Sequence, residues 1–103
     1  MAIIHPLLSQ ELLSYTTMRN KYNYILKKLF CKNLIIARKA IHRTQAQMAE
    51  LLQLDDRNYF NLEHGHSSCS SLTLALFLIY CCTDPVSFLL EIKIAFEDIQ
   101  KDK

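Results

Sequence analysis

The sequence predicts an all-α domain, on the basis of its composition, its periodicity and its capping residues. The 103 residues include one glycine, two prolines and 50% apolar residues, a composition typical of a packed helical bundle. In several segments the apolar residues recur at the spacing of one helix face. Residues that cap helices precede most of these segments. A chain of this length supports one domain, and we expect no separate sensor domain.

Residues 1–18 are rich in apolar side chains, so we expect them to form an extension that packs against the core of the same subunit or against a partner subunit. A short helix from Pro6 to Tyr15 could cover the core of its own subunit or exchange with a partner to make a dimer, and the sequence leaves both open. The apolar residues of this segment are Ile3, Ile4, Leu7, Leu8, Leu12, Leu13 and Tyr15.

Residues 20–42 predict one helix with a basic side and an apolar side. Eight of the twelve basic residues lie in 19–43, and no acidic residue lies between Glu11 and Glu50. At 100° per residue, four lysines fall within about 20° of one line, and seven apolar residues lie opposite them. The lysines are Lys21, Lys28, Lys32 and Lys39, here called the lysine ridge; the apolar residues are Tyr22, Leu26, Leu29, Phe30, Leu34, Ala37 and Ile41. The ridge suits phosphate contact, and an ordinary solvated lysine face is the alternative interpretation.

Residues 44–65 predict two short helices joined by a tight turn. Thr44 and Gln47 have the spacing of a capping box, so the first helix should begin at Gln45 and end near Gln53. Its apolar stripe consists of Met48, Ala49 and Leu52.

The second helix of this segment should be capped by Asp55 and ended by Gly65. Helical spacing then directs Tyr59 and Leu62 into the core. The residues expected to face outward, fully or in part, are Asp56, Arg57, Phe60, Asn61 and His64.

In this register residues 44–65 resemble the helix-turn-helix of the Xre/Cro family, the lambda-repressor-like DNA-binding domains. The matching residues are Thr44, Gln45, Ala49, Leu52, Tyr59, Leu62, Glu63 and Gly65. The resemblance extends over roughly residues 25–97 and implies a compact domain of five helices, to which we assign residues 19–99. An ordinary helical hairpin without a nucleic-acid role is the alternative.

Two further helices are expected after this segment. Ser70 or Ser71 can cap a helix through Tyr80 that is apolar nearly all round, so protein should cover most of it. The N-terminal extension or a second subunit could supply that cover. Asp84 and Pro85 should begin a last helix that runs to about Ile99, with residues 100–103 as a frayed tail.

The resemblance implies that the second helix of the motif enters the major groove of double-stranded DNA. Arg57 can then bond guanine, Asn61 can bond adenine, and Phe60 can press on a thymine methyl. Asp56 could accept a bond from cytosine N4. Expected phosphate contacts are Gln45, Asn58, Lys28, Lys32, Lys39, Arg43, His64, Ser67 and Ser68. For each residue the alternative is a solvated side chain or, for Phe60, partial burial.

Several positions depart from the family pattern. Residues 43–66 carry two formal positive and four formal negative charges, a net charge of −2, so DNA attraction should come mostly from the lysine ridge. Gln53 stands where the family often has a turn glycine, which costs about 1 kcal/mol if the backbone there needs a positive φ. Arg43 stands where the family usually has a leucine, and Ile41 can supply the missing apolar contact.

Other chemistry has little support. His64, His66 and Cys69 form an H-x-H-x-x-C cluster without a fourth ligand nearby, so we predict no metal. Cysteines 31, 69, 81 and 82 have no CxxC spacing and are expected to be reduced and mostly buried. No catalytic constellation or cofactor motif can be assembled, so we expect no enzyme, no cofactor and no small-molecule ligand. Without an apolar run long enough to span a membrane, we expect a soluble, cytoplasmic protein.

The sequence therefore predicts a homodimeric, sequence-specific transcriptional regulator. A repressor that binds a short inverted repeat through the helix at 55–64 is the preferred form. The alternative is a protein-interaction module, either antitoxin-like or a helix-turn-helix that has lost DNA affinity. An acidic recognition helix favours this alternative, whereas the lysine ridge, Arg57 and Asn61 favour DNA binding.

Overall fold

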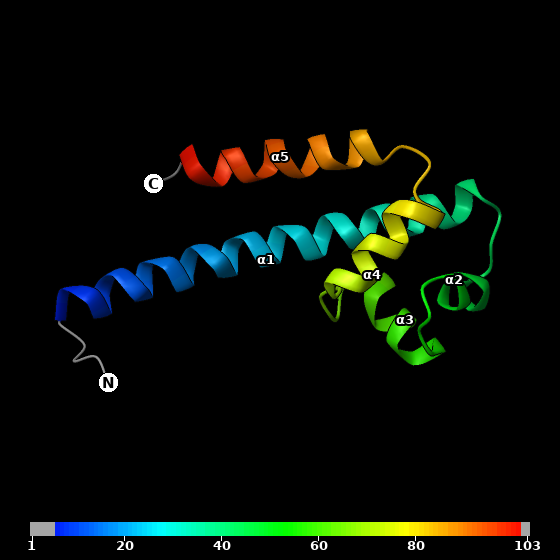
Figure 1. Ribbon diagram of the computed structural model, residues 1–103, viewed down its shortest axis with the longest axis horizontal. Coiled ribbons are helices and arrows are strands. Elements are labelled where there is room, and N and C mark those ends of the chain that lie inside the picture. The colour runs from blue at the N-terminus through cyan, green and yellow to red at the C-terminus, as the bar shows by residue number, and fades with distance from the viewer. Residues whose placement is uncertain (1–5, 102–103) are drawn as a thin grey trace.

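The computed structural model describes the backbone of residues 6–101 and the side chains of residues 17–101. This part of the chain is all-helical and contains no strand, as predicted (Figure 1). The elements are α1 (Pro6–Ala40), α2 (Gln45–Leu51), α3 (Asp56–Glu63), α4 (Ser71–Leu76), a π-helical turn η1 (Phe77–Cys81) and α5 (Pro85–Lys101).

Helix α1 is longer than the sequence suggested. The backbone of Pro6–Tyr15 is helical, as expected, but it continues without a break into the helix predicted at 20–42. The packing expected for the apolar side chains of residues 1–16 lies outside the described residues. At its other end α1 stops at Ala40, because His42 adopts a positive φ of 55° that a helix cannot continue.

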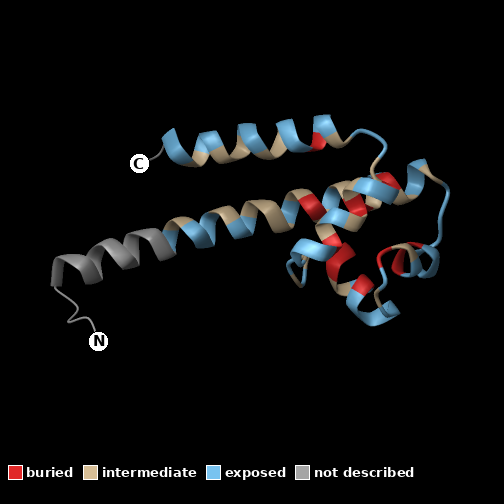
Figure 2. Ribbon diagram, viewed as in Figure 1, coloured by how far each residue is buried: buried red, intermediate tan, exposed pale blue. Residues whose placement is uncertain are grey.

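The core lies where the C-terminal half of α1 meets the shorter helices (Figure 2). At its centre the ring of Phe77 contacts Phe30 and Phe88, with centroids 5.1 and 5.5 Å away. The predicted inward residues of α2 and α3 are buried here. The buried apolar residues are Phe30, Leu34, Ala37, Met48, Ala49, Leu52, Tyr59, Leu62, Phe77, Cys81 and Phe88.

The helix expected from Ser70 or Ser71 to Tyr80 is present, but its last turn differs. Ser70 caps it, and the chain widens into η1, where the Cys82 N–H donates to Phe77 O at 2.9 Å. Its outer side remains exposed: Leu72, Ile79 and Tyr80 keep 66%, 68% and 63% of their surface accessible. Within the described part of the chain, the expected cover is therefore not supplied.

Helix α5 runs antiparallel along α1. Phe96 packs on Tyr22 with ring centroids 4.7 Å apart, and near the other end of α5 Glu91 accepts from Asn33 at 3.0 Å. Asp84 caps α5 as predicted, accepting from the Ser87 N–H at 3.0 Å. The helix reaches Lys101, two residues past the predicted end. None of the described helices is both long enough and apolar enough to cross a bilayer.

Candidate nucleic-acid interface

The two short helices of the motif begin where their capping residues predict. The Gln47 N–H donates to Thr44 Oγ1 at 3.1 Å, and the Thr44 N–H donates to Gln47 Oε1 at 2.9 Å, which completes the capping box. Asp55 Oδ1 accepts from the Asn58 N–H at 2.7 Å and caps α3. The start of each helix is thus held by its own local sequence.

The turn between α2 and α3 depends on Gln53. Its φ is 58°, a positive value that costs more free energy for glutamine than for the glycine that the resembled family often has here. This conformation lets the Leu54 N–H reach Ala49 O at 2.8 Å, while the Gln53 side chain donates to Glu50 O at 3.0 Å. The chain then enters α3, which ends at Glu63 and is followed two residues later by Gly65, whose φ is 71°.

The outer face of α3 presents the predicted base-reading residues together. Asp56, Arg57 and Phe60 are exposed, and Asn61 is half-buried beside them. Asn58 is exposed as well, but its amide donates to Asp55 Oδ2 at 3.2 Å, so its side chain already has a role in the cap. A shallow cleft of about 270 Å³ separates this face from the start of α2 and is lined by Gln45, Ala46, Asp56, Tyr59 and Phe60.

The end of α3 carries an aromatic cluster that the sequence reasoning missed. Phe60 stacks on His64 with ring centroids 3.8 Å apart, and His66 lies 5.9 Å from His64. His64 Nδ1 lies 2.9 Å from Phe60 O, so its Nε2 is left free for a partner. The i, i+4 spacing of an aromatic residue and a histidine was the available signal. One face of the Phe60 ring is covered by this stack.

A buried ion pair joins α3 to α1. Arg38 Nη2 lies 2.7 Å from Glu63 Oε1 and Arg38 Nε lies 3.0 Å from Oε2, with 5% of the Glu63 side chain exposed. Gln45, an expected phosphate contact, donates its amide to Glu63 Oε1 at 3.2 Å. The Cys31 thiol adds a bond to Glu63 O at 2.9 Å. Glu63 therefore anchors the end of α3 to both α1 and α2.

The contacts around the Arg38–Glu63 pair shift the pKa values of Glu63 and Tyr59. Burial raises the pKa of Glu63, but hydrogen bonds, first among them that from Arg38, outweigh it and hold the pKa below its usual value. The buried Tyr59 hydroxyl lies beside the Arg38–Glu63 pair. Its pKa is raised well above the usual range, mainly by burial and secondly by the Glu63 carboxylate. Glu63 is thus a carboxylate, and Tyr59 a neutral phenol, at neutral pH.

The lysine ridge forms on the exposed side of α1, opposite the buried Phe30 and Leu34. Lys32 is not free, since its Nζ lies 3.0 Å from Glu91 Oε1 on α5, and this contact lowers the pKa of Glu91. Lys28 sits over the Tyr24 ring, 4.8 Å from its centroid. The residues of α1 that hydrogen-bond to α3 are Cys31 and Arg38, which lie roughly 60–80° around the helix from Lys28 and 100–120° from Lys32. Lys32 therefore faces α5, and Figure 1 shows α5 and α3 on different sides of α1.

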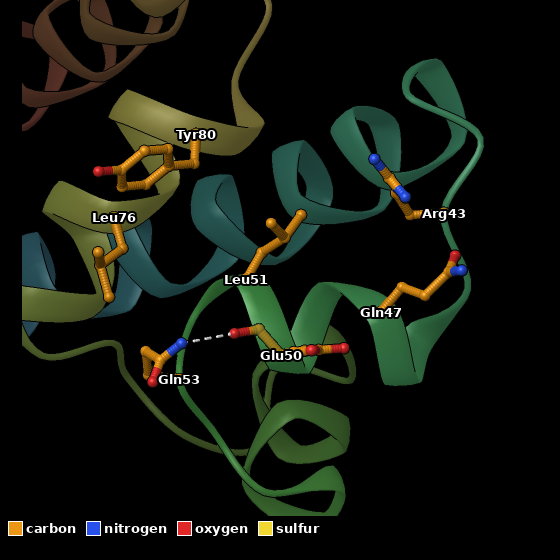
Figure 3. Close-up of a pocket in the computed structure, with 7 residues that line it drawn as sticks. All are labelled: Arg43, Gln47, Glu50, Leu51, Gln53, Leu76 and Tyr80. Carbon is orange, nitrogen blue, oxygen red and sulfur yellow. Dashed lines mark hydrogen bonds between the residues drawn. The ribbon is translucent and has the colours of Figure 1, made fainter.

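A groove of about 630 Å³ lies between α2 and η1 (Figure 3). Arg43, expected at a phosphate, forms part of its rim with Gln47 and Glu50. Leu51 and Tyr80 are among its apolar lining residues. Ser67 and Ser68 lie in the loop after α3, half-buried and exposed respectively.

No metal-binding constellation occurs among the residues that the structure describes. His64, His66 and Cys69 do not come together as a group of three possible ligands. The four cysteines are free thiols; Cys81 is buried and the other three are half-buried.

Comparison of the chain with models of known protein families, with curated proteins and with solved structures finds no match in any of the three.

Proposed function

We propose that this protein is a sequence-specific DNA-binding transcriptional regulator of the Xre/Cro type. The observation that carries the proposal is the geometry of α2 and α3: two capped helices joined by one tight turn. The second of these helices turns Asp56, Arg57 and Phe60 outward. A helix with a polar outer face and a rigid attachment is what major-groove readout requires. The Arg38–Glu63 pair supplies the attachment.

In this proposal Arg57 reads guanine and Asn61 reads adenine, each contributing about 1–3 kcal/mol of discrimination. His64 Nε2, at the C-cap of α3, and the Ser68 hydroxyl, in the loop after α3, contact the phosphate backbone. The protein acts as a homodimer on an inverted repeat and represses by covering a promoter. Because Lys32 is paired with Glu91, the free phosphate contacts of the ridge are Lys28 and Lys39.

The test is selection of bound duplexes from a random DNA pool at moderate salt, followed by sequencing. We expect enrichment of an inverted repeat whose half-sites lie about one helical turn apart. No enrichment, even at low salt, would overturn the proposal.

Two variants then separate base reading from general attraction. Arg57→Ala should relax the preference at one base position, whereas Lys28→Ala should weaken all sequences alike. Arg19→Ala, at an exposed site on α1 more than five turns before α2, is the matched control and should change neither. Uniform weakening by Arg57→Ala would refute its role as a base reader.

A protein-interaction module is the second candidate, and the exposed side of α4 and η1 favours it. Leu72, Ile79 and Tyr80 keep about two thirds of their surface accessible there, and residues 43–66 carry a net charge of −2. The dependence of binding on salt distinguishes the two, since phosphate binding falls steeply with salt and apolar association does not.

A further inference from the structure

The ring of His64 makes one hydrogen bond in the structure, and this bond determines what its other nitrogen can do. Nδ1 lies 2.9 Å from Phe60 O, and a carbonyl oxygen can only accept, so Nδ1 carries a proton and donates it. A neutral imidazole has a single N–H, which leaves Nε2 as an acceptor. Nε2 can donate only when the ring is an imidazolium. The neutral and the charged ring of His64 therefore bind different partners.

In the proposed function the partner of Nε2 is a phosphate oxygen of DNA, which can only accept. Two acceptors do not bond to each other, so the neutral ring of His64 has nothing to donate to the phosphate. The imidazolium supplies both the missing N–H and a positive charge, and a hydrogen bond assisted by charge is roughly twice as strong as a neutral one. Contact between this ring and the phosphate backbone thus requires that the ring take up a proton.

We propose that DNA binding by this protein is coupled to the uptake of one proton at His64. The inference rests on the proposed function and adds to it a dependence on pH. At acidic pH the end of α3 has one more phosphate contact, and at alkaline pH that contact is lost and the lone pair of Nε2 faces the phosphate. Histidine is the side chain whose charge ordinarily changes between about pH 5 and 8, which sets the range to be measured.

The surroundings of the ring can accommodate an imidazolium. His64 is exposed, so the charged ring keeps contact with water on one side. Phe60 stacks on it with ring centroids 3.8 Å apart and planes inclined by 24°, and an aromatic face attracts a cation. His64 is also the C-cap of α3, the end of a helix at which a positive charge is favourable.

The titratable groups closest to the ring do not take the place of the phosphate. On α3 the Glu63 carboxylate is turned away into its ion pair with Arg38. In the loop the ring of His66 lies 5.9 Å from that of His64, between centroids. On α1 the Cys31 thiol donates to Glu63 O, and burial, followed by the Glu63 charge, raises the pKa of this thiol, so it is neutral at neutral pH.

More distant charges do not pair with the ring either. Helix α3 packs against α1 and α2. The other charged residues of these helices toward this side are Lys27 and Lys28 of α1, Glu50 of α2, and Asp56 and Arg57 of α3. Among the residues that the structure describes, none of them forms an ion pair with His64. The charge of an imidazolium at this position is therefore available to a phosphate.

The first experiment measures the affinity of the whole chain for a random-sequence duplex of about 20 base pairs at fixed low salt, from about pH 5.5 to about pH 8.5. The wild type should bind about tenfold more tightly at the acidic end, the effect of one charge-assisted hydrogen bond. His64→Gln has an amide that donates at every pH and should lose this dependence. His66→Gln, the same change at the exposed neighbouring histidine, is the matched control and should keep it. Circular dichroism at each pH confirms that the proteins are folded.

A second experiment examines the ring without DNA. Nitrogen NMR of the free protein at about pH 8.5 should find the neutral ring of His64 protonated at Nδ1. A neutral ring protonated at Nε2 would overturn the inference, because it could donate to a phosphate without taking up a proton. With the duplex bound, the ring should hold both protons at a pH at which the ring of the free protein has lost one.

The outcomes separate this inference from the proposed function. An affinity that does not change with pH, or a change that persists in His64→Gln, would overturn the inference and leave the proposed function intact. A pH-dependent affinity for the random-sequence duplex, in a protein that enriches no sequence from the DNA pool, would support the inference and refute sequence-specific regulation. Absence of binding to any duplex at any pH would refute both.

Discussion

Replacing Arg38 with methionine should destabilise the fold more than any substitution on the surface of α3. Methionine keeps most of the length of the side chain but removes both hydrogen bonds to Glu63, at 2.7 and 3.0 Å. The carboxylate, 5% exposed in the wild type, keeps the amide of Gln45 at 3.2 Å and the Tyr59 hydroxyl beside it. Removing one partner of a buried ion pair costs about 3–5 kcal/mol, and the remaining Gln45 donor places the expected loss near 3 kcal/mol. For a protein of this size, 3 kcal/mol corresponds to a fall in Tm of about 12 °C or more.

The loss should depend on pH. In the wild type the pKa of Glu63 is below its usual value, so the pair's contribution is fully present above the unfolded-state pKa, about 4.3, and is lost as pH falls through the folded-state pKa. In Arg38→Met, burial without the arginine raises the pKa of Glu63, so acidification relieves the buried charge. The difference in free energy of unfolding between the two proteins should therefore be largest near pH 7 and shrink toward pH 4.

Urea denaturation of the two proteins at several pH values measures this directly. The double variant Arg38→Met with Glu63→Gln removes the buried charge and should be more stable than Arg38→Met alone at pH 7. Lys39→Met, at the exposed neighbouring position, is the control and should change the free energy of unfolding by less than about 0.5 kcal/mol. A loss below about 1 kcal/mol for Arg38→Met, or one that is independent of pH, would refute the reasoning.

Two further substitutions test the turn and the core. Gln53→Gly relieves the positive φ of 58° and should raise the free energy of unfolding by about 0.5–1 kcal/mol. Gln53→Ala keeps the strain, loses the hydrogen bond to Glu50 O and should lower the free energy of unfolding. Urea denaturation of the two variants measures the difference, and equal midpoints would show that no strain is stored at this residue. Phe77→Ala removes a fully buried ring that touches Phe30 and Phe88 and should lower the free energy of unfolding by about 3–5 kcal/mol. Thermal unfolding measures this loss, and a value under about 1 kcal/mol would mean that η1 is not part of the core.

The starts of α2, α3, α4 and α5 could be predicted from the sequence because their causes are local. Thr44, Asp55, Ser70 and Asp84 each cap the helix that follows, through a bond to an N–H three residues on. A residue and its neighbour at i+3 are enough to predict such a bond. The positive φ at Gln53 was expected only as a condition, because it came from the turn glycine that the resembled family often has at this position.

Contacts between distant residues could not be predicted in this way. Arg38 and Glu63 were both visible as charged residues, but they are 25 positions apart, and only the packing of α1 on α3 brings them together. Likewise, the helical wheel placed Lys32 correctly on the exposed side of α1, yet it carried no information that Glu91 of α5 would lie beside it. The side of a helix on which a residue lies follows from the periodicity of the sequence, whereas the residue that lies beside it from another helix follows from the tertiary structure.

These charges bear on how the proposed regulator would discriminate its site. Residues 43–66 are net negative, and the ridge has one of its four lysines paired with α5, so non-specific attraction to DNA should be weak and its salt slope shallow. In the proposed function a single subunit would depend on a few base contacts, such as those of Arg57 and Asn61. The two subunits of the proposed dimer would add their half-site free energies, and each would raise the effective concentration of the other at the repeat. A dimer on a weakly attracting surface would therefore bind DNA cooperatively with protein concentration, because occupancy of the site would then depend on dimer formation as well as on the residues that read the bases.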